Sequence, residues 1–222
     1  MASRLLMFCP TYHYISAKHR RRLEEMDKSP IVKQMFAIGL YLPLATENAI
    51  AQALTIPGWD RFVILEADIV PPEWAFLRTA DYTDEHDIVG TVCFRHERPH
   101  TAMVYINIDG KYHPITAQTV KAWTDKPALY EVGATSFGLV SFSRKMLEKW
   151  DRSIPMFQVN SAFGSHDMWF CHQAAKQGFH IFCDSEIVVD HLTEMPIGLE
   201  DNQRYADPNQ QVLAVQVHKE AA

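Results

Sequence analysis

The chain has 222 residues, of which 47% are hydrophobic and 22% are charged, and its 21 basic and 27 acidic side chains give a formal net charge of −6. This composition excludes a disordered or collagen-like chain and argues against a nucleic-acid coat protein or a basic arm. It allows a sizeable buried core, so we expect one globular domain, with an additional small lobe as the alternative.

The first apolar stretch, Leu5 to Phe8, ends at Cys9 and Pro10. It is far shorter than the roughly 20 apolar residues of a membrane-spanning helix, and shorter than the about 7–15 residues of a signal-peptide core. We therefore expect no membrane span and a cytoplasmic protein. The four cysteines are scattered without a C-x-x-C pair, which indicates reduced, buried thiols.

Short β-rich runs alternate with helical patterns along the chain, and this alternation predicts an α/β fold. In the first half, Leu5–Phe8 is a predicted strand closed by Pro10, and Ser16 opens a helix through about Met26. The uninterrupted run Arg61–Leu65 predicts a strand that is buried on both faces. The other predicted elements of this half are a helix at Thr46–Leu54, a short helix near Glu73–Thr79, strands at Ile88–Phe94 and Ala102–Ile106, and a hairpin turn at Asp109 and Gly110.

In the second half, the most distinct element is a helix at Asp167–Gln177, which Gly178 ends in the C′ position. The other predicted elements are strands at Leu139–Phe142, Ile181–Cys183 and Ile187–Val189, and a helix at Arg144–Trp150. Beyond Glu194 the composition becomes polar, so the last residues are expected to form a tail or a peripheral lid.

Two carboxylates, Glu66 and Asp68, flank Ala67 directly after the buried strand at Arg61–Leu65. Open α/β sheets bind ligands beyond the carboxyl ends of their strands, and a divalent ion that carries nucleotide phosphates needs oxygen ligands of this kind. The same residues also fit an acidic turn ahead of a helix, so both interpretations stay open on these three residues alone.

Two later segments strengthen the ligand-site interpretation. The sequence GSHDMWFC at residues 164–171 places His166 and Asp167 at the start of a helix, and His191 closes the strand that follows. In this order the segments resemble the GT-A glycosyltransferases, especially the small family-2-like enzymes of bacteria and bacteriophages. In those enzymes a strand ends in Asp-x-Asp, an acidic pair opens a later helix, and a histidine closes the next strand. The resemblance covers about Leu5 to His191.

The resemblance implies a GT-A fold, an α/β domain with a mixed, mostly parallel sheet flanked by helices. Residues 1–199 would form the glycosyltransferase domain, with a nucleotide-binding half at about 1–90 and an acceptor half at about 91–199, followed by a polar tail or lid at 200–222. The implied activity transfers a sugar from a UDP- or GDP-sugar to an acceptor hydroxyl with the help of Mn²⁺ or Mg²⁺. The acceptor is a modified nucleobase, a protein or a glycan, and a phage-encoded enzyme would act in the host cytoplasm.

The resemblance also assigns residues. Asp68 and His191 would bind the metal, Glu66 would contact the metal or the ribose, and Asp167 would take the acceptor proton. The nucleotide and donor would be held by Pro10, Thr11, Tyr12, Glu66, Ala67 and Asp68, with Asn48 as a weaker candidate. The sugar and acceptor pocket would include Gly133, Ser136, Phe137, Gly138, His166 and Trp169.

The chain departs from the family pattern in two places. Glu66 replaces the first aspartate, and its extra methylene group would move it toward an outer contact with the metal or a contact with the ribose. His166 stands where the first acid of the later pair is usual, which leaves Asp167 as the only carboxylate there. No residue matches the carboxylate that often recognises uracil, so the nucleotide stays open.

Each candidate also has a purely structural explanation. Asp167 is favourable in the first turn of any helix by about 0.3–1 kcal/mol, and His191 fits the end of a surface strand. The basic run Lys18–Arg22 fits a solvated helix face better than a phosphate site. Core packing explains Trp169, and a tight turn explains Gly133.

Two other functions compete with glycosyl transfer. A nucleotidyltransferase also places paired carboxylates and metal ions at a sheet edge, and it releases pyrophosphate. The other alternative is an α/β binding or assembly protein whose catalytic site has decayed. The net charge of −6 slightly disfavours a DNA acceptor, since duplex affinity comes mainly from Lys and Arg contacts to phosphates.

Overall fold

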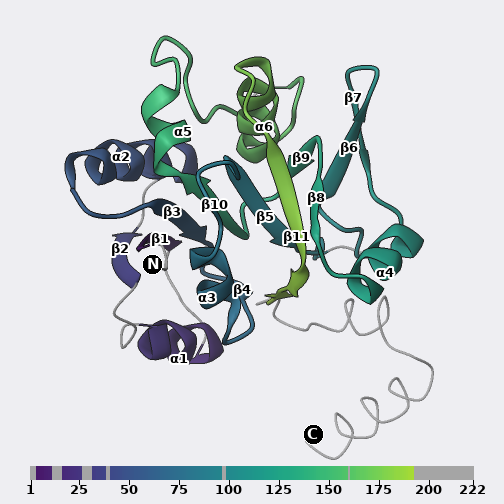
Figure 1. The fold of residues 1–222 in the computed structure, drawn as a ribbon, viewed down its shortest axis with the longest axis horizontal. Helices are drawn as coiled ribbons and strands as arrows, with labels where there is room; N and C mark the ends of the chain where they lie inside the picture. Colours follow the sequence, from purple (N-terminus) through teal and green to yellow (C-terminus); the bar gives the residue numbers. More distant parts are fainter. Residues whose placement is uncertain are drawn as a thin grey trace, which may run out of the picture. The chain divides into compact units, whose positions relative to one another are not determined.

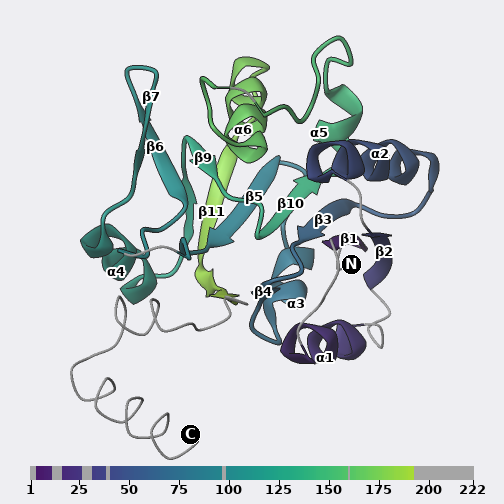
Figure 2. The same ribbon diagram turned by 180° about the vertical axis from the view of Figure 1, so that it is seen from behind.

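The computed structural model describes residues 4–11, 17–26, 32–38, 41–96, 99–159 and 161–192, and Figures 1 and 2 show it from opposite sides. Its strands are β1 (Leu5–Thr11), β2 (Val32–Ile38), β3 (Arg61–Leu65), β4 (Ile69–Val70), β5 (Ile88–Val92), β6 (Val104–Ile108), β7 (Lys111–Pro114), β8 (Leu129–Glu131), β9 (Ala134–Thr135), β10 (Leu139–Ser143), β11 (Ile181–Val188) and β12 (Asp190–His191). Its helices are α1 (Ala17–Met26), α2 (Leu42–Thr55), α3 (Ala75–Ala80), α4 (Ala117–Asp125), α5 (Arg144–Lys149) and α6 (His166–Lys176).

A seven-stranded mixed sheet in the order β2-β1-β3-β10-β5-β11-β8 is the centre of the fold. The pairings show that β1, β2, β3, β5 and β11 run in one direction, whereas β10 and β8 run in the other. The carboxyl ends of β3, β5 and β11 therefore lie at the same edge of the sheet. The predicted mixed, mostly parallel α/β sheet is confirmed.

The helices cover both faces of this sheet. On one face, α2, α5 and α6 share a core with Phe62 and Ile64 of β3, and on the other, α1 and α3 share a core with Val63 and Leu65. All five residues of β3 are buried, as predicted. Each fully buried large apolar side chain contributes about 1.5–3 kcal/mol, so β3 anchors both layers.

An aromatic cluster fixes α6 on the sheet. The ring of Phe170 lies 4.9 Å from that of Trp150, 5.0 Å from Phe142 and 5.3 Å from Phe137, measured between centroids. Phe170 is completely buried. Because aromatic pairs in such geometry add to the free energy of burial, this cluster determines where the first turn of α6, with Asp167, is held.

Two smaller sheets flank the main one. The strands β4 and β12 pair antiparallel, and β6 pairs with both β7 and β9. The predicted turn between β6 and β7 is confirmed, because Asp109 and Gly110 have φ values of 51° and 81°. Positive φ at both central residues is typical of a two-residue hairpin.

Several predicted bounds differ from the structure, and three of these differences are the largest. Strand β1 continues through Pro10 to Thr11. Beyond Phe8 it pairs with β2 alone, and proline is tolerated where one side of a strand has no neighbour. Helix α2 begins four residues before Thr46, with a proline in its first turn. The two short strands expected near the end are one strand, β11, with an irregularity that places residues 185–187 between two paired positions.

The sequence patterns did not predict β2, β4, α4, β8, β9 or β12. The predictions on Tyr12, Ser16 and the tail or lid at 200–222 lie outside the described residues. Within the described ranges, no helix is both long and apolar enough to cross a membrane.

Candidate functional site

The turn that follows β3 is held by the neighbouring strand. The backbone N–H of Glu66 donates to the carbonyl of Gly138 at 2.9 Å, and the N–H of Ile69 donates to the carbonyl of Glu66 at 3.1 Å. A Cβ atom on Gly138 would lie 3.0 Å from Cδ1 of Ile69 and 3.3 Å from the sulfur of Cys93. Close packing beneath the turn therefore explains why a glycine occupies position 138. The turn places Asp68 at the carboxyl edge of the sheet.

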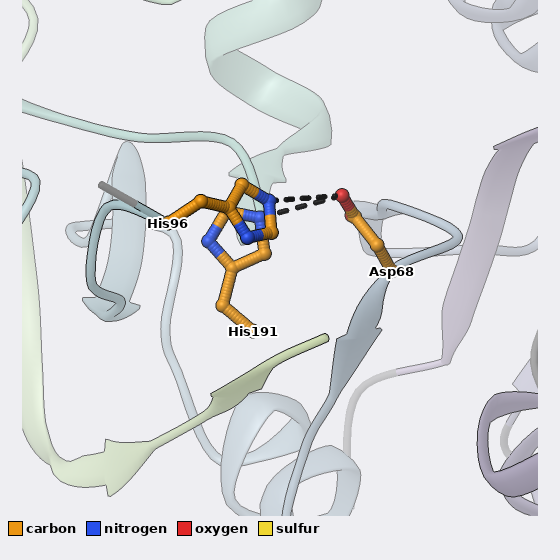
Figure 3. A group of neighbouring side chains, drawn as sticks. All are labelled: Asp68, His96 and His191. Carbon is orange, nitrogen blue, oxygen red and sulfur yellow. Dashed lines mark hydrogen bonds and ion pairs between the residues drawn. The ribbon is translucent and has the colours of Figure 1, made fainter. Parts of the chain in front are cut away.

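Strand β12 brings His191 to Asp68. In the antiparallel pair, His191 lies opposite Ile69, and the N–H of Leu192 donates to the carbonyl of Asp68 at 2.7 Å. The Nε2 atom of His191 lies 3.3 Å from Oδ2 of Asp68 (Figure 3). Two predicted metal ligands, 123 positions apart in the chain, are thus in direct contact.

A third side chain, His96, joins these two. It comes from the segment after β5, and its Nε2 lies 3.5 Å from Oδ2 of Asp68; its ring centroid is 3.4 Å from that of His191 (Figure 3). One ligand atom from each of Asp68, His96 and His191 lies within 4.8 Å of the others. Sequence analysis missed His96, although its position just beyond the carboxyl end of a parallel strand was a usable signal.

The hydrogen bonds of His191 suit a metal ligand. Its Nδ1 lies 2.6 Å from the carbonyl oxygen of Phe94, and because a carbonyl only accepts, Nδ1 carries the proton. The lone pair of the neutral ring is then at Nε2, on the side of Asp68. Metal-binding histidines commonly donate their other N–H to a carbonyl in this way, which fixes the tautomer and the ring orientation.

The charges of Asp68 and His191 depend on each other. Burial alone would raise the pKa of Asp68, but the hydrogen bond and charge of His191 outweigh it and lower that pKa. Burial likewise opposes a charge on His191, but its hydrogen bonds to Asp68, the Cys93 thiol and the Phe94 carbonyl raise its pKa to about 10. Without a metal, the two side chains therefore form an ion pair.

The carboxyl group of Glu66 and the thiol of Cys9 are affected by this pair. Burial, followed by the negative charges of Asp68 and Asp167, raises the pKa of Glu66 to about 8. Burial and the charges of Glu66 and Asp68 raise the pKa of Cys9, next to the turn at the end of β1, to about 12. Both groups are therefore protonated at neutral pH, and a bound cation would favour their charged forms. Among the described residues, the group with metal-ligand spacing contains Asp68, His96 and His191 but not Glu66.

The first turn of α6 holds Asp167. Its Oδ1 accepts hydrogen bonds from the Ser165 hydroxyl and from the N–H of Met168. The neighbouring His166 packs edge-on against Phe137, with ring centroids 5.8 Å apart, and burial lowers its pKa. The hydrogen bonds at the start of α6 therefore orient the Asp167 carboxylate. Its negative charge is one cause of the raised pKa of Glu66.

The remaining predicted residues are spread around the sheet. Pro10 is buried near the end of β1, and Asn48 is exposed on α2. Helix α2 packs on one face of the sheet, whereas Ile69 of β4 packs in the core on the other face. The structure does not bring Asn48 to the other candidates. Trp169 is partly buried and donates from its indole N–H to the carbonyl of Pro155.

Gly133 and Ser136, two residues of the predicted sugar pocket, lie on either side of β9, where β9 pairs with β6. A Cβ atom on Gly133 would lie 2.6 Å from the backbone nitrogen of Asn107, so only glycine allows this close approach. The N–H of Ser136 donates to the carbonyl of Met103, whereas its buried hydroxyl has no hydrogen-bond partner.

The architecture is a GT-A-like α/β fold, as its similarity to solved structures shows. No protein-family model matches the chain, and no curated protein matches it in sequence. The fold is similar to that of the viral A197 protein from STIV, with a TM-score of 0.63 and 18% identity over 86% of each chain.

Two enzymes share the fold at 11% identity. GalNAc-T7, solved with UDP, GalNAc and Mn²⁺, has a TM-score of 0.58 over 87% of this chain and 44% of that chain. The inositol-1-phosphate CTP transferase from T. maritima has a TM-score of 0.52 over 91% of this chain and 95% of that chain. The fold is thus shared with glycosyl- and nucleotidyltransferases.

We expect Mn²⁺ binding to strengthen as the pH rises. Because the pKa of His191 is about 10, an incoming metal ion must displace its proton, and metal affinity then increases as protons become scarcer. The dissociation constant, measured by electron paramagnetic resonance of free Mn²⁺, should fall by nearly tenfold for each pH unit between about pH 6 and pH 8. A dissociation constant that does not change with pH would contradict metal coordination by His191.

The substitution His96→Ala should weaken Mn²⁺ binding by at least about tenfold, because one imidazole ligand is lost. The matched control is His180→Ala, since His180 is exposed and pairs with Glu131 away from the cluster. Isothermal titration measures both variants. Equal Mn²⁺ affinity of the His96 and His180 variants would remove His96 from the ligand set.

Proposed function

We propose that this protein is a metal-dependent glycosyltransferase that moves a sugar from a nucleotide-diphosphate donor to an acceptor hydroxyl. The observation that carries the proposal is the meeting of Asp68, His191 and His96 at the carboxyl edge of a GT-A-like sheet. The carboxylate suits either Mn²⁺ or Mg²⁺, whereas the two imidazoles favour Mn²⁺, because imidazole is a ligand of transition-metal ions and Mg²⁺ prefers oxygen ligands. When bound, the ion would act as a Lewis acid that neutralises the departing diphosphate.

The protein's own groups would then perform the remaining steps. Asp68, His191 and His96 would hold the ion, and Glu66 would contact either its outer shell or the donor ribose. In an inverting reaction, Asp167 takes the proton of the acceptor hydroxyl while the acceptor oxygen bonds to the anomeric carbon. The bond from that carbon to the diphosphate breaks at the same time, and the nucleoside diphosphate leaves with the electron pair. In a retaining reaction, Asp167 would position the acceptor or the sugar.

The substrates follow from the same proposal. The donor would be a UDP- or GDP-sugar, held in part by Pro10, Thr11, Tyr12 and the turn at residues 66–68. The similar GalNAc-T7 structure contains UDP, GalNAc and Mn²⁺, which supports a nucleotide-sugar donor here. The acceptor hydroxyl would belong to a modified nucleobase, a protein or a glycan, and would approach past Gly133, Ser136, Phe137, Gly138, His166 and Trp169.

A nucleotidyltransferase is the second candidate. It is favoured by the similarity to the inositol-1-phosphate CTP transferase, because the match covers nearly the whole of both chains. The two reactions differ in the bond that breaks. Sugar transfer releases a nucleoside diphosphate, whereas nucleotidyl transfer releases pyrophosphate.

Product analysis tests the proposal. With Mn²⁺ and a panel of UDP- and GDP-sugars, we expect slow transfer of the sugar to water or to an added acceptor, with release of the nucleoside diphosphate. After treatment with EDTA, no nucleoside diphosphate should be released. In parallel, CTP and UTP with sugar phosphates should yield no pyrophosphate. Pyrophosphate release would favour the second candidate, and the absence of metal-dependent nucleotide binding would indicate a non-catalytic binding protein.

The substitution Asp167→Asn should lower turnover by about 10²–10⁴-fold, the usual contribution of a general base, while Mn²⁺ and donor affinity stay near wild type. Initial rates of sugar transfer and Mn²⁺ titrations measure the two effects separately. The control is Asp125→Asn, which removes an exposed carboxylate paired with Lys121 on α4 and should leave turnover unchanged. Wild-type turnover in the Asp167 variant would exclude it as the base.

A further inference from the structure

The basic segment at the start of α1 contains one residue that its solvated-face interpretation does not explain. Arg20 and Arg21 are exposed and pair with Glu24 and Glu25, one helical turn onward. His19, in contrast, is completely buried. A buried imidazole within an otherwise charged, exposed segment calls for a specific role.

The hydrogen bonds of His19 connect three elements. Its Nδ1 lies 2.6 Å from the carbonyl oxygen of Ile69 in β4, and its Nε2 lies 3.5 Å from the sulfur of Cys9 near the end of β1. The carbonyl can only accept, so Nδ1 carries the proton and donates. In the neutral ring Nε2 then accepts a hydrogen bond from the Cys9 thiol. His19 on α1 therefore connects β1, through Cys9, to β4, through Ile69.

The position of Ile69 makes this link relevant to the metal centre. Ile69 follows Asp68 in the chain and lies opposite His191 in the β4–β12 pair. Ile69 is itself completely buried, so a carbonyl that loses its donor there would be left without compensation from solvent. A group that holds the Ile69 carbonyl in place therefore also holds β4. This strand follows directly after Asp68 and pairs with β12, which carries His191.

We propose that His19 is a positioning residue of the metal centre: its Nδ1 holds the Ile69 carbonyl and thereby sets the placement of Asp68 relative to His191. This inference rests on the proposed function in one respect, that the centre binds a divalent ion. His19 itself touches neither the ion nor the substrates.

Two amide substitutions separate the role of each ring nitrogen. Asparagine places its amide nitrogen where Nδ1 of histidine lies, and glutamine places it near Nε2. We expect His19→Asn to keep Mn²⁺ affinity within about threefold of wild type and His19→Gln to weaken it by about tenfold or more, the range seen when groups that orient metal ligands are removed. Isothermal titration with Mn²⁺ alone measures both.

Controls distinguish positioning from general destabilisation. Leu23→Ala removes a buried side chain one turn along α1; it should lower the melting temperature and leave Mn²⁺ affinity unchanged. Cys9→Ala removes the partner of Nε2 but keeps the bond to Ile69, so it should also retain Mn²⁺ affinity. Far-UV circular dichroism of each variant confirms that it is folded.

The outcomes separate this inference from the function itself. Wild-type protein that binds no Mn²⁺ would overturn the metal centre, and the role of His19 with it. Wild-type binding together with an unaffected His19→Gln variant, or with equal weakening in the Asn and Gln variants, would overturn the positioning role alone. If His19→Gln does not fold, a Cys9→Ala variant that loses Mn²⁺ affinity would overturn it as well.

Discussion

The short antiparallel pair between β4 and β12 is the interaction on which the candidate site depends. It joins a turn that follows the third strand to the last described residues of the chain, through the hydrogen bond from Leu192 to the carbonyl of Asp68. The main sheet alone does not bring these segments together, because β10 and β5 separate β3 from β11. Without this pair, Asp68 and His191 would lie at the same edge but would not share an ion.

Several carboxyl groups gather near the β4–β12 pair, at a partly buried edge of the sheet. Burial, followed by the charges of Asp68 and Asp167, raises the pKa of Glu66 to about 8, so Glu66 is protonated at neutral pH unless a cation lies nearby. A fold gains nothing from such an arrangement unless a cation or a proton compensates for it. Together with the meeting of Asp68, His96 and His191, this favours a functional site over a simple acidic turn.

The sequence allowed part of this arrangement to be predicted. The buried run of β3 and the helix that begins at His166 have strong local patterns, and the carboxyl-edge rule then placed Asp68 correctly. His191 was found only through its order relative to the other motifs, since nothing local marks it. His96 was missed because it follows β5 in an irregular segment, where neither periodicity nor a motif identifies a ligand. The buried role of His19 was hidden by its charged neighbours, because composition describes a segment and not the face that each residue takes.

The irregularity in β11 has a consequence for how much this part of the chain can vary in length. Asp184 is paired with Thr91 and Val188 with Val92, so residues 185–187 are accommodated outside the regular ladder with β5. After them the chain leaves the main sheet for β12, next to β4 (Figure 1). Since side chains alternate between the faces of a strand, a gain or loss of one residue between Asp184 and Asp190 that this irregularity did not absorb would turn the imidazole of His191 to the wrong side. Related proteins that use this histidine should therefore preserve the length of this segment even where its side chains differ.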